Sequence, residues 1–358
     1  MIMGASYFTE KRSYYDKLFP PAGMLALRTF GCFGFMIHIF GHGVSLNLRL
    51  FKGTGRKAIF IGLYGFTCSI SASFLCYVAM IFTCAKATFR DHPPLGLPLF
   101  IIINSVSSFI VIASHLVNLK LINSELGNIA SSIAVVTDGC GSMMAFLANF
   151  AITVQRTKDL ALYAVAATIL FYLSLFFILR PIVLRILRTM PEDKPMKESS
   201  IFVIMTMVLL VGFFGDCSGQ SAALGVFIFG LVLPDESPLG NMMQKFDTVV
   251  SSLLLPIFCT LSGLRTNMFA LRRQSSPLVE LIIIAGYVGK FTGVLISSVF
   301  LEMPFHDALP LALLLCCKGL AELGVYGFCR DTQLMTEELF TLAMITMVVV
   351  TGILLSVV

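Results

Sequence analysis

The sequence predicts an all-α polytopic membrane protein with about eleven transmembrane helices. Of its 358 residues, 57% are hydrophobic and only 13% are charged, whereas a soluble domain carries about 25% charged residues. The apolar runs are each around 20 residues long, which is the length that spans a bilayer as a helix. No strand-like alternation repeats along the chain, so an outer-membrane barrel is not expected.

The elements start with a polar lead at residues 1–22, which has no signal-peptide pattern. Eleven apolar runs follow, and each is predicted to cross the membrane as a helix. Their approximate limits are 25–46, 58–83, 97–117, 126–154, 160–179, 201–215, 219–233, 246–264, 278–301, 308–328 and 339–358. Pro256 interrupts the eighth run, and 191–200 is the clearest linker. Asp216 is expected to cap the seventh helix at its start.

Composition argues against several other classes of protein. The net charge of +5 is modest and lies mostly in short loops, so no nucleic-acid partner is expected. The ten cysteines are scattered without a CxxC pair, which indicates small apolar residues and no metal or disulfide framework. His38 and His42 are four residues apart, but no third ligand is visible, so neither a metal site nor a cofactor is predicted.

Asp138 is the one charged residue in the run 126–154. A carboxylate near the centre of a span costs roughly 3 kcal/mol on insertion scales. Such a group needs a cation, a water-filled cavity or a proton to offset that free energy, and an ion carrier needs the same things. The sequence therefore predicts that Asp138 is the ion and proton site of a membrane transporter. The structural alternative is a carboxylate that only holds helices together.

Further polar groups lie within the predicted spans. The candidate set for binding the cation and the proton is Asp138, Thr137, Lys290, Ser107, Ser108, Asn104, Lys318 and Glu322. Lys318 and Glu322 are four apart within 308–328, so one helix face is expected to carry both. A buried lysine could pair with the empty carboxylate, and a broken helix could offer carbonyls to the ion.

Each of these groups also has a structural interpretation. Lys290 could extend its ammonium to the membrane surface. Lys318 and Glu322 could form a neutral structural pair, and the polar groups at 104–108 could hydrogen-bond between helices. An intramembrane aspartyl protease would need Asp138 and Asp216 in one site. Its Gly-x-Gly-Asp signature fails because Phe213 stands at the first position, so an enzyme is not predicted.

Several motifs match one family in order and spacing. They are Arg56-Lys57, Leu121-Ile-Asn-Ser-Glu125-Leu-Gly127, Gly225-Val-Phe-Ile-Phe-Gly230-Leu-Val-Leu-Pro234, Leu254-Leu-Pro256-Ile-Phe, Leu261-Ser-Gly263-Leu-Arg-Thr-Asn267, Gly289-Lys290 and Lys318-Gly-Leu-Ala-Glu322. From about residue 25 to the C-terminus, the chain resembles the plant cation/proton exchangers of the monovalent cation/proton antiporter-2 group.

The resemblance implies a sodium/proton-antiporter-like fold of inverted repeats, in which the middle core helix of each repeat is broken and the two broken helices cross. It assigns 58–154 and 277–358 to a moving core, 23–48 and 201–266 to a panel, and 158–190 to a linker helix, all within an exchanger domain at 23–358. The repeat is expected to be incomplete, because two N-terminal helices of the family have no counterpart here. The family's soluble C-terminal region has no counterpart either. The family's Asn-Asp pair is Thr137-Asp138 here.

The resemblance implies antiport of K⁺ or Na⁺ against protons by a multi-pass protein of a plant plasma membrane or endomembrane, with a role in pH homeostasis. It also implies a homodimer in the lipid bilayer. The family has a proline after Ser-Phe, but here Ile110 follows Ser108-Phe109. Without that proline, the sequence gives less reason for a helix break within 97–117. The alternative function is a truncated membrane protein that does not transport and associates with full-length relatives.

Overall fold

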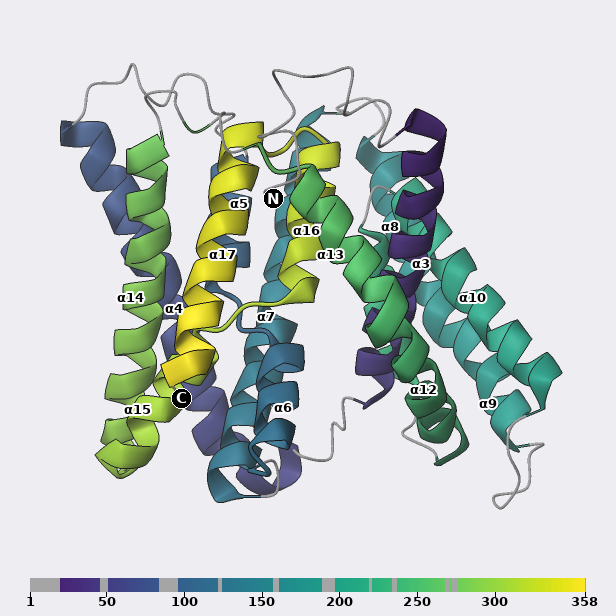
Figure 1. Cartoon of the computed structure of the whole chain (residues 1–358), viewed down its shortest axis with the longest axis horizontal. Coiled ribbons are helices and arrows are strands. Elements are labelled where there is room, and N and C mark those ends of the chain that lie inside the picture. Colours follow the sequence, from purple (N-terminus) through teal and green to yellow (C-terminus); the bar gives the residue numbers. More distant parts are fainter. Residues whose placement is uncertain are drawn as a thin grey trace. The chain divides into compact units, whose positions relative to one another are not determined.

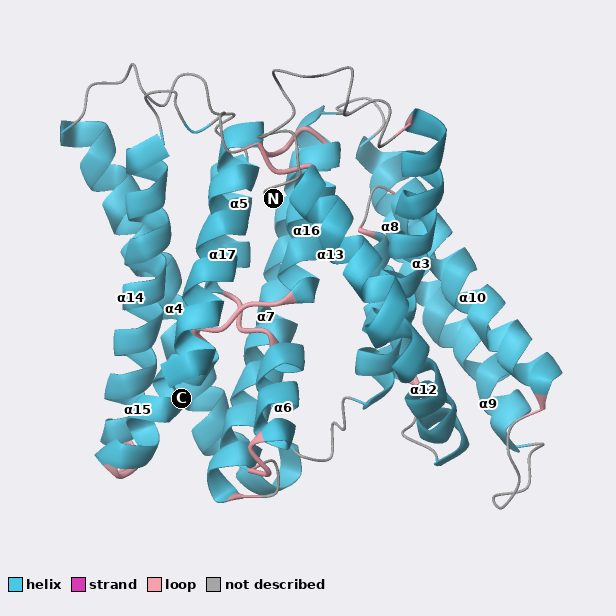
Figure 2. Ribbon diagram, viewed as in Figure 1, coloured by secondary structure: helices cyan, strands magenta, loops and turns pink. Residues whose placement is uncertain are grey.

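The chain folds into helices throughout the part that the structure describes. The computed structural model describes residues 20–45, 51–83, 96–121, 124–156, 161–188, 197–218, 221–233, 237–267, 271 and 276–357. Within those residues no β-strand occurs (Figure 2). A helix satisfies its own backbone hydrogen bonds, which lipid cannot do, so apolar runs of this length fold as helices. The predicted all-α class is confirmed.

The helices follow one another as shown in Figure 1. Their bounds are α3 Pro21–Ser45, α4 Phe51–Thr83, α5 Gly96–Ser105, α6 Phe109–Asn118, α7 Glu125–Arg156, α8 Ala161–Ser174, η3 Leu175–Leu179, α9 Arg180–Arg188, α10 Glu198–Cys217, α11 Ala222–Val232, α12 Ser237–Val249, η4 Val250–Leu254, α13 Leu255–Leu264, α14 Ser276–Phe300, α15 Phe305–Leu315, α16 Leu320–Asp331 and α17 Glu337–Val357. The polar lead predicted at 1–22 lies mostly outside the described residues.

Eight helices or helix pairs of the described chain are long and apolar enough to cross a membrane. The other three predicted spans correspond to the pair α5 and α6, to α7, and to the short helix α11. The protein is therefore a multi-pass integral membrane protein. Two of the predicted spans, 97–117 and 308–328, are each interrupted near their middle, and these interruptions build the candidate site.

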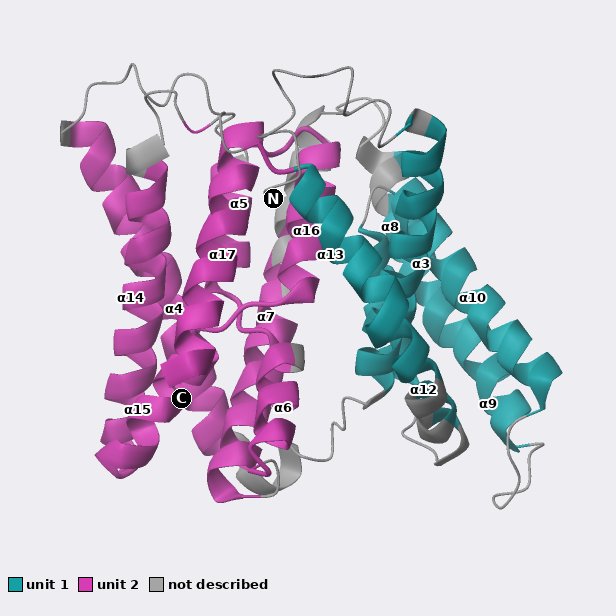
Figure 3. Cartoon of the chain, viewed as in Figure 1, with its two compact units in different colours: residues 1–47, 149–265 teal, residues 48–148, 266–358 magenta. Residues whose placement is uncertain are grey.

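The chain divides into two compact units, which Figure 3 distinguishes by colour. Unit 1 comprises residues 1–47 and 149–265, and unit 2 comprises residues 48–148 and 266–358. The linker helix predicted at 158–190 lies in unit 1. The assignment of a moving core and a dimerising panel stays a prediction.

Unit 1 contains a close crossing of α3 and α11. A Cβ at Gly43 would lie 2.5 Å from the Phe227 carbonyl oxygen, and a Cβ at Gly230 would lie 2.5 Å from that of Phe40. Only glycine allows the two backbones to approach this closely. At the start of α11, the Ala222 amide donates to Asp216 Oδ1 at 3.0 Å, so Asp216 caps this helix as predicted.

Two π-helical turns in unit 1 each end two residues before a proline. The segment η3 precedes Pro181, and η4 precedes Pro256. Proline has no amide hydrogen, so the carbonyl four residues earlier loses its usual partner. A π turn shifts the hydrogen-bond register at that point. The predicted interruption at Pro256 is thus a local change of register within a continuing helix.

Unit 2 is built around the tightly packed pair α4 and α14. A Cβ at Gly289 would lie 2.5 Å from the Cβ of Ala72, so the two helices meet at small residues. Two buried hydroxyls of α4 add hydrogen bonds: Ser69 Oγ donates to the Gly286 carbonyl at 2.9 Å, and Ser73 Oγ donates to the Ile282 carbonyl at 3.2 Å. This packing fixes the position of α14, which carries Lys290.

Candidate ion site

The first helix break lies between α5 and α6, at residues 106–108. Two ammonium groups bind carbonyls of the last turn of α5 and of the break itself. Lys290 Nζ donates to the Ser105 carbonyl at 2.9 Å, and Lys318 Nζ donates to the Val106 carbonyl at 2.9 Å and the Ile103 carbonyl at 3.4 Å. The negative end of a helix attracts cations. The break therefore forms without the family proline.

The second break lies between α15 and α16 and leaves residues 316–319 outside any helix. Gly319 is extended, with φ −147° and ψ −156°, and its amide donates to Glu322 Oε2 at 2.9 Å. The prediction of one helix face carrying Lys318 and Glu322 is therefore wrong. Lys318 precedes α16, whereas Glu322 lies in its first turn and caps it. The broken helix that the resemblance implies is confirmed.

Asp138 lies on α7 and is partly exposed. The amide of Phe109, the first residue of α6, donates to its Oδ2 at 3.0 Å. Asp138 thus caps α6 from the neighbouring helix α7, whereas Glu322 caps its own helix α16. Amides and the helix dipole favour negative charge at a helix N-terminus, so both carboxylates lie where anions are stabilised.

The two breaks lie side by side, which Figure 2 shows as two loops that cross at mid-height. The Ser108 amide donates to the Cys317 carbonyl at 3.3 Å. Ser107 Oγ donates to the Leu315 carbonyl, the last of α15, at 2.8 Å. The crossing therefore brings together the negative ends of α5 and α15 and the positive ends of α6 and α16.

The four charged groups of this site do not form the ion pair that was expected between a lysine and a carboxylate. In the described part of unit 2, no contact within 4.0 Å joins Asp138 or Glu322 to Lys290 or Lys318. The lysines bind carbonyls and the carboxylates bind amides. Asp138 is nevertheless within electrostatic range of the other three charges. Backbone groups, with their fixed dipoles, take the place of direct counterions.

The hydroxyl and amide groups of the predicted set differ in what they bind. Thr137 Oγ1 donates to the Ala134 carbonyl at 2.9 Å, within its own helix, and Asn104 Nδ2 donates to the Ile283 carbonyl on α14 at 3.4 Å. Asn104 therefore fits the structural interpretation of a hydrogen bond between helices, and the Thr137 hydroxyl is occupied within α7. By contrast, Ser108 Oγ and Glu322 Oε1 are buried and have no hydrogen-bond partner among the described residues. A buried oxygen without a partner is available to a cation.

Sequence reasoning missed two side chains of the site. Thr351 of α17 hydrogen-bonds both backbone groups of Lys318. The ring centroid of Tyr287 lies 5.5 Å from Lys318 Nζ. Both residues lie in apolar runs and carry no charge, so no pattern distinguishes them from ordinary residues of a span.

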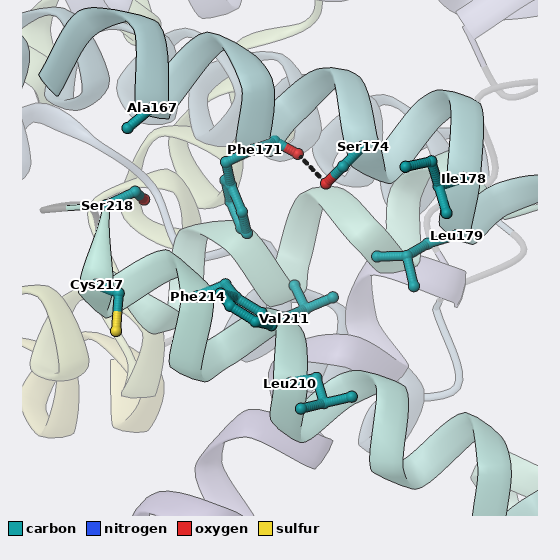
Figure 4. A pocket seen from close by; sticks show the side chains of 10 residues that line it. All are labelled: Ala167, Phe171, Ser174, Ile178, Leu179, Leu210, Val211, Phe214, Cys217 and Ser218. Carbon is teal, nitrogen blue, oxygen red and sulfur yellow. Dashed lines mark hydrogen bonds between the residues drawn. The ribbon is translucent and has the colours of Figure 1, made fainter. Parts of the chain in front are cut away.

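A pocket of unit 1 has a different character. This pocket holds about 490 Å³ between α8, η3 and α10, and apolar side chains such as Phe171, Leu179 and Phe214 line it (Figure 4). The Ser174 hydroxyl already donates to the Phe171 carbonyl at 2.6 Å. No carboxylate or amine is among the lining residues. The lining of this pocket therefore offers no charged group to an ion.

Comparisons with known proteins agree with this fold. The profile of the family described as sodium/hydrogen exchanger, transmembrane, matches residues 2–358. The chain is 31% identical to cation/H⁺ antiporter 15 of Arabidopsis thaliana over all of its length and 43% of the relative's length. It is 30% identical to cation/H⁺ symporter 13 of the same plant, over 99% of this chain and 42% of that relative.

A solved structure gives an independent comparison of the fold. The sodium proton antiporter of Methanocaldococcus jannaschii superimposes with a TM-score of 0.64 at 15% sequence identity. The match covers 99% of this chain and 86% of that one. The arrangement of helices is thus that of an all-α antiporter fold.

Proposed function

The chain belongs to the sodium/hydrogen exchanger family, and from that membership we propose that it exchanges a monovalent cation, K⁺ or Na⁺, for protons across a membrane. The single observation that carries this proposal is Asp138, a partly exposed intramembrane carboxylate at the positive end of α6. The protein then moves ions without a covalent reaction and is not an enzyme.

In the proposed mechanism the cation and the proton compete for Asp138. The ionised carboxylate binds the cation, and protonation removes the charge that holds it. The hydroxyl of Ser108 and the free Oε1 of Glu322 are the oxygens that best suit replacement of the ion's water. Lys290 and Lys318 hold the end of α5, so the site keeps its shape when the cation leaves.

We propose that the protein acts as a homodimer in a plasma membrane or endomembrane, as the resemblance implies. The curated relatives include a symporter as well as antiporters. Movement of the proton opposite to the cation is therefore itself part of the proposal. The second candidate is a protein that does not transport by itself and associates with longer relatives. Thr137 favours it, because its hydroxyl binds its own helix where the family has an asparagine.

The test is cation-dependent proton flux in vesicles that contain this chain. The parent should exchange K⁺ or Na⁺ for protons, and Asp138→Asn should abolish the exchange because the amide cannot take up a proton. Asp247→Asn is the matched control, since Asp247 is an exposed carboxylate of unit 1. Flux with the parent that persists in Asp138→Asn would exclude Asp138 as the site. No flux from a folded parent would favour the second candidate.

A further inference from the structure

The break between α15 and α16 leaves backbone groups that a membrane cannot satisfy. The Cys317 carbonyl accepts from the Ser108 amide at 3.3 Å. Both backbone groups of Lys318 share one partner, the hydroxyl of Thr351. The Lys318 amide donates to Thr351 Oγ1 at 3.0 Å, and Thr351 Oγ1 donates to the Lys318 carbonyl at 3.2 Å. One side chain of α17 thus completes the hydrogen bonding of the peptide groups on both sides of Lys318.

Thr351 departs from the usual behaviour of a hydroxyl within a helix, which is to donate to a carbonyl of its own preceding turn. Examples among the described residues, each donating to the carbonyl four positions earlier, are Thr67, Thr206, Thr260, Thr292 and Ser356. Ser356 lies on the same helix as Thr351 and donates to the Gly352 carbonyl at 2.8 Å. Thr351 instead reaches a residue 33 positions away in sequence.

The residue that Thr351 holds is one of the two buried lysines of the candidate site. Lys318 is 2% exposed, and its ammonium contacts the Val106 and Ile103 carbonyls. We infer that Thr351 is a positioning residue, which fixes the backbone of Lys318 and so determines where its ammonium meets the end of α5. The consequence for ion exchange rests on the proposed function. The positioning itself does not.

The first test measures the positioning without transport. Hydrogen exchange of the Lys318 amide is followed in the detergent-purified protein, for the parent and for Thr351→Val, Thr351→Ser and Ser356→Ala. Valine keeps the shape of threonine and removes the hydroxyl, so the amide should exchange roughly tenfold faster because two hydrogen bonds are lost. Serine keeps the hydroxyl, and Ser356→Ala alters only a bond within α17. Both should exchange as the parent does.

The second test measures the consequence for exchange. Thr351→Val should displace the pH profile of flux and raise the KM for the cation several-fold, and Thr351→Ser should restore both. In a Lys318→Met background, Thr351→Val should change neither, because the group that Thr351 positions is gone. A structural role alone would reduce the amount of folded protein and leave the pH profile unchanged.

The outcomes separate the inference from the proposed function. Parent-like amide exchange in Thr351→Val overturns the positioning, and so does a parent-like pH profile in an active protein. If the parent transports no cation, the proposed function fails, whereas faster amide exchange in Thr351→Val still supports the positioning. Should the valine variant not fold, Thr351→Ala replaces it, with the same expected changes.

Discussion

Each charged side chain at the crossing is paired with a backbone group of opposite polarity. The ammonium of Lys290 meets the carbonyl end of α5, and the carboxylate of Asp138 meets the amide end of α6. A helix end carries the equivalent of about half an elementary charge. Buried charges are normally paired or satisfied by hydrogen bonds. The ends of the broken helices supply these partners. The two carboxylates are therefore stabilised although neither has a lysine of the described chain within ion-pairing distance.

Lys290→Met should destabilise the protein by about 1–3 kcal/mol, because the Ser105 carbonyl would be buried without its donor. The measurement is thermal unfolding in detergent. Lys57→Met is the control, since Lys57 is exposed at the start of α4 and should change the free energy of unfolding by less than about 0.5 kcal/mol. Equal effects of the two substitutions would contradict the role assigned to Lys290.

Glu322→Ala removes the acceptor for the Gly319 amide and should cost roughly 1 kcal/mol of stability, as loss of a helix cap does. Glu322→Gln keeps an acceptor oxygen and should lose less. Measuring both unfolding and vesicle flux for the two variants separates the role of Glu322 in capping α16 from the role of its charge. If Glu322→Gln is as stable as the parent yet transports poorly, the charge itself serves exchange. If Glu322→Gln loses as much stability as Glu322→Ala, the cap needs a carboxylate.

Among the elements, α16 depends on the absence of a side chain at Gly319. A Cβ there would lie 2.4 Å from Val111 Cγ2 and 2.7 Å from Ser108 Oγ. The backbone of Gly319 is extended, so any L-residue could adopt it and the obstacle is steric. Gly319→Ala should therefore force the two breaks apart, lower the unfolding temperature and reduce flux.

Gly327→Ala, within α16, is the matched control, because no atom beyond its own turn of helix lies within 4 Å of its added Cβ. Alanine is favoured over glycine inside a helix by about 1 kcal/mol, so this variant should be as stable as the parent or more so. Similar losses in both variants would indicate that α16 tolerates no added methyl group and would remove the case for a special contact at Gly319.

The spans themselves follow from sequence, because their length and apolar character are properties of contiguous residues. The capping role of Asp216 could also be predicted, since its partner lies six residues away. The partners of Lys290 and Lys318 could not. They are main-chain carbonyls of α5 and of the break after it, and every residue has one, so no side-chain pattern marks them. The break at 316–319 contains no proline, and local sequence alone favours one continuous helix.

For the whole molecule, the proposed competition of cation and proton at Asp138 predicts the direction of the pH dependence. As pH falls, a larger fraction of Asp138 is protonated in the cation-free state, so the KM for the cation should rise. The rise is at most about tenfold per pH unit for one competing proton. Initial rates of flux, measured over a series of cation concentrations at several pH values, give the KM. A KM that falls as pH falls would contradict competition.

One carboxylate that carries either one cation or one proton predicts one-for-one exchange without net charge movement. Flux in vesicles should then be the same whether the membrane potential is clamped at zero or made negative with an ionophore for an ion that the protein does not carry. A rate that responds to the potential would require a second titrating group, for which Lys290 is the first candidate to test by substitution.

The contact between α4 and α14 has a consequence for how this chain can vary through evolution. The Cβ of Ala72 and the position that a Cβ of residue 289 would occupy are 2.5 Å apart, so two side chains of any size cannot occupy both sites. A larger residue at 72 has no compensating loss available at Gly289, and a side chain at 289 would need both glycine at 72 and a shift away from the Cys68 carbonyl oxygen, 2.9 Å from the same Cβ position. In an alignment of relatives, these two positions should therefore never be bulky together, although 217 residues separate them in the chain.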